Sequence, residues 1–104
     1  MKTVITSTGN TSESAFDKRF GRAAWFCLYD DALRQVEFYE NEYVNAAGGA
    51  GTKVAEKMVE LGVKKVISGD FGPKAKDLLE KFQVQMVVVQ EDATVIQLLD
   101  KIRN

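Results

Sequence analysis

The chain has 104 residues, of which 45% are hydrophobic and 28% are charged, and its formal net charge is −1. This size and composition predict one globular domain, and the small net charge excludes a whole-molecule field that would drive nucleic-acid or membrane binding. The sequence contains no histidine and a single cysteine, which excludes an intrachain disulfide and argues against a conventional zinc or iron–sulfur site within one chain.

No apolar run approaches the roughly 18 residues of a membrane span. The short apolar run after Met1 is too brief for a signal peptide. We therefore expect a cytoplasmic protein.

The first 40 residues predict three strands. Residues 3–6 are rich in strand-forming side chains, and a polar loop over residues 7–14 follows them. Residues 25–29 and 35–40 flank a short acidic turn and predict a β-hairpin. Cys27 lies within the first hairpin strand, so we expect a small core residue rather than a reactive thiol.

The segment between the first two strands interleaves aromatic and basic side chains. Phe16 and Phe20 alternate with Lys18, Arg19 and Arg22. One interpretation is a loop that presents the two arginines to an anionic partner. The other is that the two phenylalanines anchor the segment in the core while the charges remain in solvent.

A glycine-rich stretch over residues 45–53 precedes the first predicted helix, at residues 52–61. Gly48, Gly49 and Gly51 give the backbone unusual freedom. A glycine loop that leads into a helix exposes unpaired N–H groups at the positive end of the helix dipole, which suits an anion. The alternative is a tight loop that lets the helix pack closely on a sheet.

The second half predicts alternating strands and helices. Strands are expected at residues 65–68 and 85–89, and the apolar run over residues 86–89 indicates a strand buried on both faces. A second glycine-bearing loop at 69–74 leads into a helix with Pro73 at its first position. Residues 91–94 are expected to cap a last helix that begins at Val95.

The element order is therefore β-β-β-α-β-α-β-α, which predicts an α/β fold with a mixed five-stranded sheet covered by helices. Ligands on such sheets usually bind beyond the carboxyl ends of parallel strands. We expect the loops at 7–24, 45–53 and 69–74 to converge on one surface there.

Three motifs together resemble the dinitrogenase iron–molybdenum cofactor biosynthesis family of NifX-like, NafY-like and NifB C-terminal-domain-like proteins: Arg19-Phe20-Gly21-Arg22, the stretch from Asn45 to Gly51, and Ser68 to Ala75. The resemblance covers the whole chain, as one domain over residues 1–104. It implies an RNase H-like three-layer fold with strand order 3-2-1-4-5 and strand 2 antiparallel to the rest. It also implies a carrier or scaffold for metal–sulfur clusters, with cluster donor or acceptor proteins as partners.

Family members often carry a histidine just before the Phe-Gly pair, where this chain has Arg19. We therefore expect an iron–molybdenum or other metal–sulfur cluster, or a related oxyanion or thiometallate, to be held mainly without His or Cys ligands. Asp17 and Asp70 in the same loops would offset part of the positive charge. The expected cofactor-binding residues are Arg19, Phe20, Gly21, Arg22, Gly48, Gly49, Gly51, Lys53, Gly69, Gly72 and Lys74.

The sequence does not predict an enzyme. The first strand carries no carboxylate of the kind that an RNase H-type two-metal site needs, and no histidine is present to complete a catalytic triad. The alternative to a carrier is a protein-interaction or regulatory module without bound metal, for which hairpin aromatics would supply contacts. We expect a monomer or homodimer.

Overall fold

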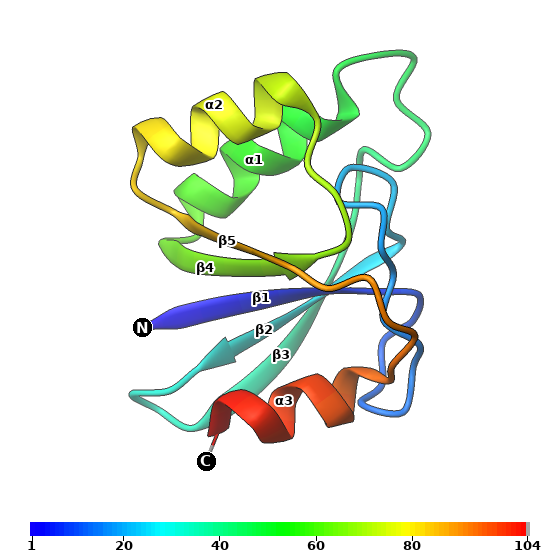
Figure 1. Ribbon diagram of the computed structural model, residues 1–104, viewed down its shortest axis with the longest axis vertical. Helices are drawn as coiled ribbons and strands as arrows, with labels where there is room; N and C mark the ends of the chain where they lie inside the picture. Colours follow the sequence, from blue (N-terminus) through cyan, green and yellow to red (C-terminus); the bar gives the residue numbers. More distant parts are fainter. Residues whose placement is uncertain (104) are drawn as a thin grey trace.

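Five strands form one mixed sheet in the order β3-β2-β1-β4-β5. The computed structural model describes residues 1–103 (Figure 1). β1 pairs antiparallel with β2 and parallel with β4, while β3 extends the antiparallel side and β5 the parallel side. The predicted strand order and element order are confirmed, with elements β1 (Lys2–Ser7), β2 (Trp25–Asp30), β3 (Gln35–Glu40), α1 (Ala50–Glu60), β4 (Val63–Ser68), α2 (Pro73–Lys81), β5 (Gln85–Val88) and α3 (Val95–Arg103).

Two hydrophobic cores lie on opposite faces of the sheet. In Figure 1, α1 and α2 lie side by side on one face, and α3 lies on the other. Because successive strand residues point to opposite faces, Val4 of β1 packs in the core beneath α1 and α2, whereas Ile5 packs in the core beneath α3. The result is a three-layer α/β/α arrangement.

The helix ends follow local chemistry. α1 begins at Ala50, two residues earlier than expected, directly after Gly49 in a left-handed conformation with φ of 69°. The N-terminus of α3 is capped as predicted. The Thr94 N–H donates to Gln97 Oε1 at 2.9 Å, and the Gln97 N–H donates to Thr94 Oγ1 at 3.4 Å. No helix within residues 1–103 is long and apolar enough to cross a membrane.

The prediction that residues 86–89 form a strand buried on both faces is wrong. β5 is an edge strand, and Val88 at its end is 57% exposed. Met86 and Val87 are only half-buried. An apolar run shows that a strand is hydrophobic, but it does not show whether another strand lies beside it or how far the helices extend over it.

Candidate functional site

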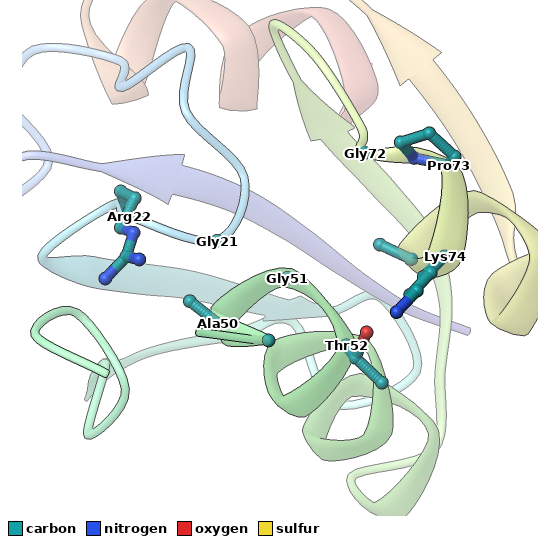
Figure 2. Close-up of a pocket in the computed structure, with 10 residues that line it drawn as sticks. Gly21, Arg22, Ala50, Gly51, Thr52, Gly72, Pro73 and Lys74 are labelled. Carbon is teal, nitrogen blue, oxygen red and sulfur yellow. The ribbon is translucent and has the colours of Figure 1, made fainter. Parts of the chain in front are cut away.

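A pocket of about 460 Å³ lies where the first turns of α1 and α2 meet the segment that connects β1 to β2. We call residues 16–24 of this segment the strap. Figure 2 shows Gly21 of the strap directly above Gly51 of α1, with Gly72 and Pro73 at the start of α2 across the pocket. The loops at 7–24, 45–53 and 69–74 therefore do contribute to one surface, and the lining residues are Gly21, Arg22, Gly49, Ala50, Gly51, Thr52, Gly72, Pro73, Lys74 and Ala75.

Both helices begin at this pocket without a side-chain cap. Neither Gly49 nor Gly72 can supply a capping oxygen from a side chain, and no acidic residue lies in either first turn. The first intrahelical bonds of the two helices run from the Lys53 N–H to Gly49 O at 3.0 Å and from the Lys76 N–H to Gly72 O at 2.9 Å. The N–H groups before them have no partner within their helices, so two positive dipole ends face one pocket.

The charged side chains of the pocket are both cations. Of its ten lining residues, all within the described part of the chain, Arg22 and Lys74 are charged and none is acidic. Figure 2 shows Lys74 extending toward Thr52 in the first turn of α1. Lys74 forms no ion pair and no side-chain hydrogen bond with residues 1–103, so its ammonium group can serve an incoming anion.

Arg22 has a structural task as well. Its Nη1 donates to Val44 O at 2.8 Å and to Ala46 O at 2.9 Å. It thereby ties the strap to residues 41–49, the loop between β3 and α1. Because these two carbonyls take up Nη1, Arg22 contributes its charge to the pocket from a fixed position.

A buried amide also holds the strap in place. The Asn41 side chain donates to Gly21 O at 3.1 Å and to Ala23 O at 2.8 Å, and its Oδ1 accepts the Tyr43 N–H at 2.9 Å. Asn41 is only 2% exposed. The loop before α1 and the strap are therefore cross-linked by side-chain hydrogen bonds at the edge of the pocket.

Gly21 permits a very close approach of the strap to α1. A Cβ atom at this position would lie 2.8 Å from both the Cα and the N of Gly51. Any side chain at residue 21 would therefore push the strap away from the start of α1.

Two of the residues expected at the site are placed elsewhere in the strap. Arg19 pairs with buried Asp17, since its Nη2 lies 2.9 Å from Oδ2 and its Nε lies 3.1 Å from Oδ1. The hydrogen bond to Asp17 and the charge of Asp17 raise the pKa of Arg19. Phe20 is 1% exposed, and its ring centroid lies 5.0 Å from that of Phe71. Phe16 and Phe20 are thus the core anchors of the strap.

Three further expected residues lie outside the pocket lining. Lys53 projects over the Tyr43 ring, with its Nζ 5.7 Å from the ring centroid. Gly69 packs so tightly that a Cβ atom there would overlap Lys18, and Gly48 faces open space. The structure therefore brings together Gly21, Arg22, Gly49, Gly51, Gly72 and Lys74 from the expected set.

Four lining residues were not in that set: Ala50, Thr52, Pro73 and Ala75. The signal that identifies them is their position in the first turns of the two helices, where backbone N–H groups rather than side chains carry the chemistry.

The described residues do not offer a side-chain ligand set for a metal ion. Residues 1–103 contain no group of three or more His, Cys, Asp or Glu side chains suited to a metal. Cys27 is fully buried in the core beneath α3, and burial raises the pKa of its thiol to about 12. Cys27 is thus a core residue, as expected, on the sheet face opposite to α1 and α2.

Comparison with known proteins agrees with the resemblance seen in the sequence. The family described as dinitrogenase iron–molybdenum cofactor matches residues 1–104. The apo form of the orange protein from Desulfovibrio gigas is 28% identical with a TM-score of 0.89, and the match covers 97% of this chain and 85% of that chain. A Thermotoga protein described as NifB-type and assigned to the DUF35 family is 32% identical with a TM-score of 0.83, over the same shares of the two chains.

A third solved structure is 19% identical with a TM-score of 0.79, covers 99% of this chain and 90% of its own, and supports the fold alone. No curated protein matches the chain. The family match extends over every residue of the sequence. The chain therefore belongs to the dinitrogenase iron–molybdenum cofactor family.

Proposed function

We propose that this protein is a non-enzymatic carrier that binds an anionic metal–sulfur cluster, an iron–molybdenum cluster or a related thiometallate, in the pocket between α1 and α2. The observation that carries the proposal is the pocket lining, in which two uncapped helix starts and two cations meet without an acidic side chain. Membership of the iron–molybdenum cofactor family supports this class of ligand.

The binding chemistry follows from the lining. Backbone N–H groups at a helix start donate to anions and are supported by the helix dipole. Lys74 would add a charge-assisted hydrogen bond, which is about twice as strong as a neutral one. Within residues 1–103, three or more His, Cys, Asp or Glu side chains do not come together, so the cluster would be held by charge and hydrogen bonds.

This mode of binding suits a protein that passes its ligand on. Release of an anion from N–H groups breaks no bond between the metal and the protein. We therefore infer that the partners are proteins that donate or accept the cluster.

The proposal is tested by titrating the purified protein with tetrathiomolybdate under anaerobic conditions and following the visible spectrum. Lys74→Ala should weaken binding about ten-fold or more, because one charge-assisted hydrogen bond contributes about 1.5–3 kcal/mol. Lys76→Ala is the matched control, since Lys76 is exposed on the same helix outside the pocket.

Equal binding by Lys74→Ala and the wild type would contradict the site. Failure of the wild type to bind would contradict the carrier function and favour the alternative, an interaction module that works without a metal.

A further inference from the structure

β5 leaves one edge of the sheet open to a further strand. It pairs only with β4 among the strands of residues 1–103, and just beyond it the Val89 N–H donates to Ser68 O at 2.9 Å. Because successive strand residues direct their backbone groups to opposite sides, Val87 turns toward β4 as Val89 does. Met86 and Val88 therefore direct their N–H and C=O groups away from the sheet, where a second strand could bind them.

This edge lacks the features that usually prevent strands from pairing. Natural sheet edges are protected by charged side chains, proline or bulges. Residues 83–90 contain no charged residue and no proline, β5 keeps a regular register with β4, and Val88 is 57% exposed. The opposite edge, β3, carries Glu37 and Glu40, which would repel a second copy of that strand. Of the two edges, β5 is the one suited to pairing.

A second copy of β5 matches this edge in an antiparallel register. About a two-fold axis at Val87, Met86 of each copy lies opposite Val88 of the other, so the outward N–H and C=O groups meet as hydrogen-bonded pairs. Residues two apart in a strand share a face of the sheet. The exposed Val88 side chain would thereby cover the half-buried Met86 of the second copy.

Two charged side chains of α2 lie beside the same edge. Ala75 and Leu79 are the buried residues of α2, and Leu78 shares a surface groove with α1. With 3.6 residues per helical turn, about 100° per residue, Lys76 and Glu80 then lie on the side of α2 away from α1. Both are exposed, and neither forms an ion pair within residues 1–103.

These charges are complementary in the two-fold arrangement. An axis at Val87 that relates two antiparallel β5 strands also places the two copies of α2 antiparallel on one face of the joined sheet. Lys76 of each copy then lies on the side of Glu80 of the other. The same symmetry thus matches backbone groups, apolar side chains and charges.

We propose that two copies of this chain associate through β5, in an antiparallel pair that joins their sheets into one. The contact is a short strand pair flanked by exposed charges, so the dimer should form and dissociate with concentration. None of residues 85–88 lines the pocket between α1 and α2. The proposal is therefore independent of the ligand and of the carrier function.

Sedimentation analysis over a range of concentrations tests the proposal. The wild type should shift from the monomer mass of 11.6 kDa toward twice that mass as its concentration rises. Val88→Lys should raise the dissociation constant about ten-fold or more, because a lysine on a strand edge opposes pairing. Leu33→Lys is the matched control, since Leu33 is 63% exposed on the turn between β2 and β3, and it should leave the dissociation constant unchanged.

A charge exchange on α2 tests the register without altering β5. Glu80→Lys should weaken the dimer about three- to ten-fold, because lysines then face each other where exposed ion pairs would form. Adding Lys76→Glu to the same chain restores opposite charges and should restore the affinity. Amide hydrogen exchange locates the contact, since the N–H groups of Met86 and Val88 should exchange more slowly at high concentration while that of Val87, which faces β4, should not change.

A wild type that remains monomeric up to about 1 mM would overturn the proposal, because even a weak complex forms at that concentration; the edge would then be open to a strand of another protein. A dimer that Val88→Lys and Leu33→Lys weaken equally would place the contact elsewhere. Failure of the double charge exchange to restore the affinity lost in Glu80→Lys would show that the register is wrong.

Discussion

Replacement of Asn41 by alanine should destabilise the protein by about 2–5 kcal/mol. The side chain is 2% exposed and makes three hydrogen bonds, of which the bond to Ala23 O is fully buried and the bonds to Gly21 O and from the Tyr43 N–H are partly buried. An unsatisfied buried polar group costs about 1–3 kcal/mol, and each half-buried bond adds about 0.5–1 kcal/mol. For a domain near 100 residues this corresponds to a melting temperature lower by roughly 10–25 °C.

Thermal and urea unfolding, followed by circular dichroism, measure the effect. Asn45→Ala is the matched control, because Asn45 lies in the same loop and is exposed. It should change the free energy of unfolding by less than about 0.5 kcal/mol, as is usual for surface substitutions. If Asn41→Ala is no less stable than Asn45→Ala, the hydrogen bonds between the loop and the strap do not hold this part of the structure together.

Two further predictions concern the strap and the core between the sheet and α3. Gly21→Ala should lower the free energy of unfolding, measured with urea, by about 1–3 kcal/mol, because its Cβ would lie 2.8 Å from the backbone of Gly51. Gly48→Ala is the control and should be nearly neutral. Similar stability of the two variants would refute the close approach of the strap to α1. Burial raises the pKa of the Cys27 thiol from 9.0 to about 12. Between these pKa values the folded state keeps a thiol proton that the unfolded state loses. The stability that the buried, neutral thiol contributes is therefore fully present below pH 9 and is lost as the pH rises from 9 toward 12. At pH 10.5 the wild type should have lost about 1–2 kcal/mol more stability than Cys27→Ala, at up to 1.36 kcal/mol per pH unit, and parallel pH profiles of the two proteins would contradict this assignment.

Much of the fold follows from patterns that the sequence carries locally. The alternation of Val4 and Ile5 places one residue on each face of the sheet, and the helical spacing of Val54 and Met58 turns both toward the core beneath α1. The misjudged element is β5, since the exposure of Val88 depends on what lies beside the strand. That is a property of the assembled layers rather than of residues 85–89.

The site was predictable in outline and not in its details. Glycine loops that lead into helices indicate open N–H groups, and the topology brings two such loops together. Which cation faces the pocket depends on contacts made on folding: Arg19 pairs with Asp17, Arg22 binds the carbonyls of Val44 and Ala46, and Lys74 keeps its charge free for the pocket. Arg22 and its two acceptors are 22 and 24 residues apart in the sequence, so a local sequence pattern cannot predict these hydrogen bonds.

The most direct test of the carrier function is anaerobic purification from the native host, followed by elemental analysis and a visible spectrum of the same sample. We predict near-stoichiometric molybdenum, iron or copper with a charge-transfer band, and a marked loss of both when Lys74→Ala is purified in the same way. A colourless, metal-free wild-type protein that also fails to take up tetrathiomolybdate would contradict the carrier function.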